Sequence, residues 1–441
     1  MCLYDSFFFF WFLVSNRLKT QRMKKVLLSF CFGLGILVQA QQYVHQVLVL
    51  NEGYYDYQTS TQGVPVTVGS YNPSTQLYQE VSTINGMRFA SDLIIDGNHY
   101  YVAADTKILK YDLNTHALVA EVMCPGVRNL AISQGKLIAT RGEYLTTFDS
   151  YLHVYDANSL QLIQAIDTIQ GPKWATQNIV IQGNTAFVAV NNGYEWGNEK
   201  GLIGRLDLQN LSYGNEIDLG PDGKNPDNLF AYNGMLYTVN NKDWSGSSVS
   251  KVNVLAGSVQ TENIANAGTG CGTSALFNDK LIYQLSMATS LEAYDLNLFN
   301  YSGPVNGHSL SYYELAQNPV NQQLYTTETD YFSYGTVHIF DPSHQELSQF
   351  QVGVSPGTVT FDLRSSAQLH ETSVSEALAY PNPANGTFHI AGYEAGNISV
   401  YSLDGKHIKT MAAMDLTTEG IPSGFYVLTC DGNRISSLMV K

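Results

Sequence analysis

Aromatic, amide and charged side chains stand at the ends of many short apolar segments in this 441-residue chain. Aromatic rings stack on sugars, peptides and planar molecules, while amide and guanidinium groups supply directional hydrogen bonds. We therefore expect a binding site for a small molecule, a glycan or a protein partner. Nine residues are the candidates for ligand contact: Arg88, Arg128, Trp174, Asn178, Tyr194, Trp196, Asn228, Trp244 and Tyr331.

The nine candidates belong to a wider set of residues in two classes of loop. Because Asn and Asp at strand ends also cap turns, turn formation is the alternative role for the amides in this set. Loops that precede the first strand of each repeated unit add Asp92, Asn129, Lys173, Gln177, Asn225, Asp227, Tyr312 and Glu314. Loops that follow the second strand add Glu52, Tyr54, Tyr55, Arg141, Glu143, Tyr144, Asn191, Asn192, Glu195, Asn240, Asn241, Asp243, Glu328 and Asp330.

Histidine and acidic residues form no recognisable catalytic pattern. All ten His follow residue 40, and none forms a His-x-His or His-x-x-x-His pair. His153 and His338 precede aromatic-Asp strand ends, so we expect them at sheet edges facing solvent. Acidic residues in the candidate loops could act as general acid and base, but no ordered partner accompanies them. The sequence predicts no catalytic residue, no metal site and no cofactor.

A recurring strand positions the candidate loops. An apolar segment ends in an aromatic or aliphatic residue followed by Asp or Asn, and this pattern occurs seven times at steps of 40 to 51 residues. A period in the forties with short strands between turns is typical of a β-propeller, in which each period is one four-stranded blade. The copies end at Asn72, Asp112, Asp156, Asp207, Asn253, Asp295 and Asp341.

The order of strands predicts how the ring closes. The first period begins without an innermost strand, and the missing strand appears at residues 358–363, after the seventh period is complete. A first blade shared between the two ends would leave no exposed sheet edge. The predicted innermost strands span residues 89–95, 127–132, 176–181, 228–232, 273–277, 313–317 and 358–363.

At this point the chain resembles exported seven-bladed propellers of the YncE-like, YVTN-repeat type. The resemblance covers about residues 45–363 and is greatest for a Bacteroidetes (DUF5074-like) branch whose mature chain opens with Asn-Glu-Gly, here Asn51-Glu52-Gly53. It implies a non-catalytic binding protein, and some members of this group capture corrinoids beside outer-membrane transporters. An enzyme is the alternative, because lactonases and lyases also use seven-bladed propellers with His and acidic residues on the channel. Only His308 lies near such a place here.

Composition and the N-terminus indicate where the protein works. Hydrophobic residues make up 44% and charged residues 14% of the chain, so it is globular. Residues 23–40 read as a signal peptide, with Met23-Lys24-Lys25 as the basic part, and residues 1–22 as a mis-annotated upstream extension. Beyond residue 40, 18 basic side chains stand against 37 acidic ones, which disfavours nucleic acid as a partner. The predicted mature chain is a monomer without a transmembrane segment.

Cysteines are few. Cys124, Cys271 and Cys430 form neither a disulfide framework nor a metal motif, although an exported protein could hold one bridge.

The C-terminal part is a separate module. Residues 364–379 are polar and Ser-rich, as in a linker. Residues 380–441 alternate as short strands with turn motifs, which predicts a small β-sandwich. This segment resembles the type A C-terminal sorting domain of the type IX secretion system, which implies export across the outer membrane by that machinery. The motif residues are Pro381, Asn382, Pro383, Gly386, Asp404, Gly405, Gly424 and Tyr426.

Overall fold

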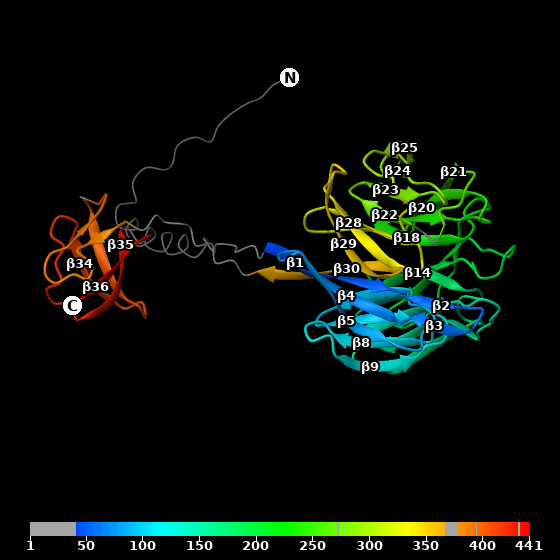
Figure 1. Cartoon of the computed structure of the whole chain (residues 1–441), viewed down its shortest axis with the longest axis horizontal. Coiled ribbons are helices and arrows are strands. Elements are labelled where there is room, and N and C mark those ends of the chain that lie inside the picture. The colour runs from blue at the N-terminus through cyan, green and yellow to red at the C-terminus, as the bar shows by residue number, and fades with distance from the viewer. Residues whose placement is uncertain (1–40, 271–272, 367–376, 394, 431–432) are drawn as a thin grey trace, which may run out of the picture. The chain divides into compact units, whose positions relative to one another are not determined.

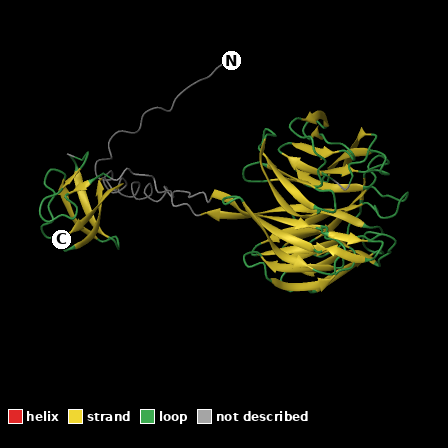
Figure 2. Ribbon diagram, viewed as in Figure 1, coloured by secondary structure: helices red, strands yellow, loops and turns green. Residues whose placement is uncertain are grey.

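The computed structural model describes residues 41–441 except 271–272, 367–376, 394 and 431–432. The predicted upstream extension, the signal peptide, most of the linker and Cys271 lie outside the described residues. The chain divides into two compact units, one of residues 42–364 and one that contains residues 365–441. Every regular element in the described part is a β-strand (Figure 2). The described residues contain no helix long and apolar enough to cross a membrane.

The first unit consists of four-stranded sheets that follow one another along the chain (Figure 1). In the described residues there are seven such sheets, compatible with propeller blades, and a two-stranded hairpin of β2 (Tyr54–Asp56) and β3 (Thr61–Val64). In pairing order, the sheets are β30 (Pro356–Ser366), β1 (Gln41–Asn51), β4 (Val66–Asn72) and β5 (Leu77–Ile84); β6 (Asp92–Asp96), β7 (His99–Ala104), β8 (Lys107–Asp112) and β9 (Leu118–Met123); β10 (Val127–Ser133), β11 (Lys136–Arg141), β12 (Ser150–Asp156) and β13 (Leu162–Asp167); β14 (Thr176–Gln182), β15 (Thr185–Val190), β16 (Leu202–Asp207) and β17 (Ile217–Asp218); β18 (Pro226–Tyr232), β19 (Met235–Asn240), β20 (Ser247–Asn253) and β21 (Ser258–Ala265); β22 (Ser274–Phe277), β23 (Lys280–Gln284), β24 (Leu291–Asp295) and β25 (Asn300–Val305); β26 (Leu315–Gln317), β27 (Leu324–Glu328), β28 (Tyr334–Phe340) and β29 (Glu346–Val354).

The Asp or Asn that ends each third strand caps the following turn. Asp156 Oδ1 accepts hydrogen bonds from the backbone N–H groups of Asn158 and Ser159, at 3.0 and 2.8 Å. The equivalent side chains Asn72, Asp112, Asp207, Asn253, Asp295 and Asp341 accept the same kind of backbone bond. A carboxylate or amide oxygen that satisfies two backbone donors fixes a tight turn. The repeat in the sequence is therefore a repeat of capped turns.

Alternation along each second strand joins neighbouring sheets. In β7, Tyr100 packs with Leu48 of the first sheet, whereas Tyr101 packs with Leu137 of the third. Successive strand residues point to opposite faces, so one strand contributes to two cores. Residues of successive second strands share the later cores in the same way. The pairs are Ile138 with Val188, Phe187 with Leu236, Tyr237 with Leu281, and Ile282 with Leu324. Tyr325 of the seventh sheet then packs with Val47 of the first.

The strand predicted over residues 358–363 is β30, and it pairs with β1 at the start of the unit. Two backbone bonds extend the junction, from Glu52 N to Ser355 O at 2.8 Å and from Gly53 N to Val354 O at 3.0 Å. Gln46 Nε2 also donates to Asp362 Oδ2 at 3.1 Å. These contacts cover the edge of β1, which would otherwise present unpaired backbone groups.

Two predicted innermost strands begin later than expected. Residues 89–91 and 313–314 precede β6 and β26 instead of belonging to them. Several of these residues line a cavity, described below, so their backbone leaves the sheet to face it.

The second unit is a small β-domain. Its elements are β31 (Ala379–Tyr380), which pairs with β32 (His389–Ile390), and the sheet β34 (His407–Ala412), β33 (Asn397–Ser402), β35 (Gly424–Cys430) and β36 (Asn433–Val440). Phe388, Val400 and Leu428 belong to its core. Asn382 ties the Pro-Asn-Pro turn to β36, because it donates to Ser437 O at 3.1 Å and accepts from Met439 N at 2.8 Å.

Of the remaining sorting-motif residues, Gly386 and Asp404-Gly405 stand at turns, and Gly424 and Tyr426 belong to β35. Gly386, Gly405 and Gly424 adopt φ of 105°, 83° and 159°. Tyr426 Oη donates to Pro422 O at 2.7 Å, and Asp404 accepts a hydrogen bond from Ser402. Pro381 and Pro383 flank Asn382 in the first turn.

Removal of β30 should strongly destabilise the first unit. A chain that ends at residue 354 loses Val359 from the core between the seventh and first sheets and exposes the edge of β1. Each large apolar side chain contributes roughly 1.5 to 3 kcal/mol, so the loss should reach several kcal/mol. A chain that ends at residue 372 keeps β30 and serves as the control. Equal melting temperatures of the two truncations would contradict this account.

Candidate functional site

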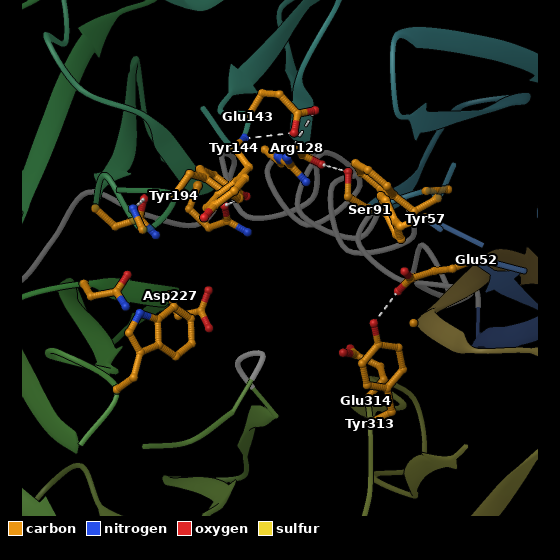
Figure 3. A pocket seen from close by; sticks show the side chains of 18 residues that line it. Glu52, Tyr57, Ser91, Arg128, Glu143, Tyr144, Tyr194, Asp227, Tyr313 and Glu314 are labelled. Atoms are coloured by element: carbon orange, nitrogen blue, oxygen red, sulfur yellow. Dashed lines mark hydrogen bonds and ion pairs between the residues drawn. The ribbon is translucent and has the colours of Figure 1, made fainter. Parts of the chain in front are cut away.

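A cavity of about 500 Å³ opens among the candidate loops (Figure 3). Its walls come from segments that precede first strands and from loops that follow second strands. The lining residues are Glu52, Tyr57, Phe89, Ala90, Ser91, Arg128, Glu143, Tyr144, Gln177, Asn191, Gly193, Tyr194, Asn225, Asp227, Trp244, Tyr313, Glu314 and Gly357. A preformed hollow with aromatic walls and a few convergent polar groups is the usual form of a ligand site.

Two glutamates from opposite ends of the first unit share one wall of the cavity (Figure 3). Tyr313 Oη donates to Glu52 Oε1 at 2.7 Å. Burial raises the pKa of Glu52 to about 7, against the smaller lowering effects of the Tyr313 bond and the Arg128 charge. The pKa of Glu314 lies well above its ordinary value because of burial first, and then because of the negative charges of Asp92 and Glu52. This wall of the cavity therefore holds two carboxyl groups whose pKa values are raised, so they lose their protons at a higher pH than exposed glutamates do.

Two aspartates near the cavity behave in the same way. Burial raises the pKa of Asp227, which lines the cavity, to about 6, although Asn241 Nδ2 donates to it at 3.0 Å. Burial also raises the pKa of Asp92 to about 6, and its Oδ2 accepts a bond from Leu130 N at 2.7 Å. These side chains are only partly exposed, so the protein around them replaces much of their hydration.

Two arginines are engaged by protein groups at this site. Arg88 Nη2 donates to Glu143 Oε2 at 2.7 Å, and its Nε donates to Asp105 Oδ2 at 3.0 Å. Arg128 Nε donates to Gly142 O at 2.6 Å, and its Nη2 lies 3.9 Å from Glu143 Oε2. Glu143 and Asp105 thus balance the charges of Arg88 and Arg128.

Aromatic rings complete the walls. The Arg128 guanidinium lies 4.3 Å from the ring centre of Tyr194 and 4.9 Å from that of Phe89, a cation–π arrangement that fixes all three groups. Tyr194 Oη donates to Gln177 Oε1 at 2.9 Å. Trp244 contributes its ring from the loop between β19 and β20. The rings are therefore held in place before any ligand arrives.

Four bulky residues stand on loops that follow second strands, and among them Trp244 lines the cavity. Leu145, Trp244, Met287 and Tyr331 each follow a second strand, and their φ angles are 54°, 67°, 67° and 69°. Bulky residues rarely adopt positive φ, but Leu160, Leu211 and Phe299 do so on turns of another class, so the geometry of the turn sets this conformation. Leu145 is 88% exposed and Met287 is 98% exposed, so burial does not explain their positions.

A second cavity of about 510 Å³ adjoins the first. It shares Glu143, Tyr144 and Tyr194 with the first cavity and reaches Trp196, whose side chain is 80% exposed. The two hollows can therefore hold neighbouring parts of one ligand.

The structure brings together four of the nine sequence candidates at these hollows. Arg128, Tyr194 and Trp244 line the first cavity, and Trp196 and Tyr194 line the second. Arg88 lines neither cavity but donates a hydrogen bond to Glu143, which lines both cavities. The other four are absent from both linings.

Each of the other four candidates has a contact within the protein. Lys200 Nζ lies 4.4 Å from the ring centre of Trp174. Asn178 Oδ1 accepts from Leu229 N at 3.4 Å, and Asn228 Nδ2 donates to Ser274 Oγ at 2.7 Å, so both amides link neighbouring sheets. Tyr331 packs edge-on against Tyr313, with ring centres 5.4 Å apart.

Seven lining residues were not predicted from the sequence: Tyr57, Phe89, Ala90, Ser91, Gly193, Tyr313 and Gly357. Tyr57 follows β2, part of an extra hairpin that the repeat did not predict. The sequence analysis named Tyr312 instead of its neighbour, but Tyr312 is buried between sheets. The alternation of side chains along a strand could have identified Tyr313, but the segment before β26 is irregular and does not follow that alternation.

The histidine predictions are wrong in part. His338 is only 4% exposed, and its Nδ1 and Nε2 lie 2.9 and 3.4 Å from carboxylate oxygens of Glu346 and Glu328. His153 is half-buried, and burial followed by the Arg141 charge lowers its pKa to about 4. Both face neighbouring strands instead of open solvent.

His308 does not line either cavity. Its Nε2 lies 2.9 Å from His344 Nδ1, and burial lowers its pKa to about 4. Within the described residues, no group of three or more His, Cys, Asp or Glu could hold a metal ion. Cys124 and Cys430 are free thiols.

Residues 378–440 match the secretion system C-terminal sorting domain family. This domain directs export, so the protein is secreted or displayed at the cell surface and is handled by the type IX machinery. The match covers most of the second unit and none of the cavity. No curated protein matches the chain.

Several solved structures align with the chain at low sequence identity. The extracellular domain of the one-component system BT4673 from B. thetaiotaomicron is 12% identical, with a TM-score of 0.47, and the alignment covers 91% of this chain and 59% of that one. Dihydro-heme d1 dehydrogenase NirN in complex with DHE is 14% identical, with a TM-score of 0.48 and coverage of 70% and 74%. Kuenenia stuttgartiensis hydrazine synthase is 15% identical, with a TM-score of 0.47 and coverage of 65% and 99%. The chain spans about three-fifths of the length of the BT4673 domain.

Glu52→Gln should stabilise the protein more at pH 8 than at pH 5. The folded pKa of Glu52 is about 7 and its ordinary value is 4.5, so the folded state keeps a proton that the unfolded state loses between these values. Wild-type stability therefore falls as pH rises from 4.5 to about 7, whereas Gln does not titrate. We expect a relative gain of about 1 to 3 kcal/mol in the free energy of unfolding.

Urea denaturation at both pH values measures this gain. Glu121→Gln, an equal charge change on the outer strand β9, is the control, because Glu121 is exposed and pairs with Lys107 at the surface. An identical effect of Glu52→Gln at pH 5 and pH 8 would contradict the assignment of a buried, reluctantly ionised carboxyl.

Proposed function

We propose that residues 42–364 form a seven-bladed β-propeller of the YncE-like type, which captures a ligand at its central cavity. The pairing of β30 with β1 and the seven cores between successive sheets support this architecture. In propellers, the loops around the channel mouth are the usual binding surface.

The cavity lining carries the proposal. Its rings are held by protein contacts before a ligand arrives, so binding does not require them to lose conformational freedom. Exposed aromatic side chains continue outward from it through Tyr144 to Trp196. A hollow of about 500 Å³ with partly buried polar groups suits a small molecule, a glycan or one side chain of a protein partner.

Capture is favoured over catalysis. The lactonase or lyase alternative requires histidine and acidic residues together on the channel, and histidine is absent from the lining of both cavities. His308, the histidine on which that alternative rested, packs against His344 and Tyr312 instead.

Trp244→Ala should reduce capture without loss of stability. Trp244 is 41% exposed on a loop and lines the cavity. An aromatic contact in a binding site contributes about 1 to 2 kcal/mol, a roughly five- to thirtyfold change in affinity. Native mass spectrometry of protein isolated from its own culture should show a bound ligand in the wild type and a depleted one in the variant. An absorption spectrum of the same sample reports whether that ligand is a corrinoid.

The control is Leu255→Ala, on an exposed turn of another loop class, which should keep the ligand. If Trp244 were instead a packing residue, its truncation would cost about 3 to 5 kcal/mol of stability. Equal ligand occupancy in the wild type and in Trp244→Ala, or a large drop in the melting temperature of the variant, would show that Trp244 is not a ligand-binding residue.

Removal of residues 378–441 should leave a folded first unit that is retained in the periplasm. The sorting domain has its own core and does not contribute to the seven sheets. Cell fractionation locates the truncated protein, and its melting transition should match that of the first unit in the full chain. Unchanged secretion of the truncated protein would contradict the role of this domain.

A further inference from the structure

The cavity has more acidic than basic side chains. Glu52, Glu143, Asp227 and Glu314 line it, whereas Arg128 is the one Lys or Arg in the lining among the residues that the structure describes. Glu143 is already occupied, because it accepts from Arg88 at 2.7 Å and lies near Arg128.

The other three carboxyls have no ion pair to a basic side chain among the described residues. Protein donors satisfy them only in part, through Tyr313 at Glu52 and Asn241 at Asp227. A positively charged ligand group could therefore pair with these carboxyls.

A buried amide donor beside these carboxyls also lacks a partner among the described residues. Asn225 lines the cavity and is only 1% exposed, yet its Nδ2 has no hydrogen-bond partner in the part of the chain that the structure describes. An unpaired buried donor costs about 1 to 3 kcal/mol, which a ligand acceptor would relieve.

Aromatic faces accompany the carboxyls. Tyr57, Tyr144, Trp244 and Tyr313 line the same hollow. The face of an aromatic ring attracts a cation, and the attraction is greater where water is excluded. Carboxyls, aromatic faces and one amide donor form a set that matches a positively charged nitrogen group with an oxygen acceptor nearby.

On the basis of the proposed capture function, we propose that this cavity binds a ligand through a protonated amine or guanidinium group, seated at Glu52 and Glu314, with Asp227 on the opposite wall (Figure 3). The Asn225 amide donates to an oxygen of the same ligand. A lysine or arginine side chain of a polypeptide and a free amine both offer this chemistry.

Binding of a cation should release protons. The groups that face Glu52 and Glu314 are Asp92, Tyr313 and Arg128, with Glu143 and Asp227 on the same cavity. A bound cation favours the ionised carboxyls, whose pKa values are raised in the empty cavity. Affinity should therefore increase from pH 5.5 to pH 8.

Two pairs of probes test the proposal by calorimetry on the full chain. The peptide pair is capped Phe-Lys-Phe and capped Phe-norleucine-Phe, and the free pair is tyramine and its uncharged analogue tyrosol. We expect the cationic member to bind at least about tenfold more tightly than its neutral counterpart in one pair or both. The pair that shows the preference identifies the source of the cation.

Charge-neutral variants locate the effect. Glu52→Gln and Glu314→Gln should each weaken the cationic probe about five- to tenfold and leave the neutral probe unchanged. The control Glu121→Gln, on the outer strand β9, should change neither. Because the pH dependence is measured on the wild type, a variant that fails to fold does not remove the test.

Equal affinity of cationic and neutral probes in both pairs, or no saturable binding of either cationic probe up to about 10 mM, overturns the inference. A neutral or anionic ligand found in the native protein would also overturn it while leaving the proposed capture function intact. The two proposals therefore fail by different observations.

Discussion

The pairing of β30 with β1 is the constraint on which the rest of the first unit depends. A four-stranded sheet cannot bury both faces alone, and each second strand here needs a neighbour on either side. With β30 in place, the seventh sheet packs on the first through Tyr325 and Val47. The same strand pairing thus joins the first and the last sheets of the unit.

The candidate site depends on the same junction. Glu52 directly follows β1, and Tyr313, its hydrogen-bond donor, is 261 positions away in the sequence. Gly357, at the start of β30, lies so near that an added Cβ would stand 2.3 Å from Glu52 Oε1. The junction of the two ends thus positions an acidic wall of the cavity, and the burial that results raises the pKa values of Glu52 and Glu314.

The sequence predicted the strands far better than the cavity. Capped turns repeat because each third strand must end at an oxygen acceptor, so Asp156 and its equivalents were visible without a structure. The sorting domain was equally visible, and the family match over residues 378–440 confirms it. These features are local, which is why a pattern of residue types reveals them.

The site depends on contacts between distant segments. Which of Tyr312 and Tyr313 faces the cavity is decided by an irregular segment before β26, and the hairpin that carries Tyr57 has no counterpart in the repeat. His338 is buried because Glu328 and Glu346 of neighbouring strands meet it. The raised pKa values of four carboxyls likewise follow from burial, which residue type alone does not specify.

Native-state hydrogen exchange most directly tests whether the junction holds the unit together. If β30 is an integral strand, its backbone N–H groups and those of β1 should exchange only through global unfolding, with the same free energy of opening as those of β7 and β11. Exchange of β30 at a much lower free energy of opening, while β7 and β11 stay protected, would show that it detaches on its own. That result would contradict a first unit stabilised by the union of its two ends.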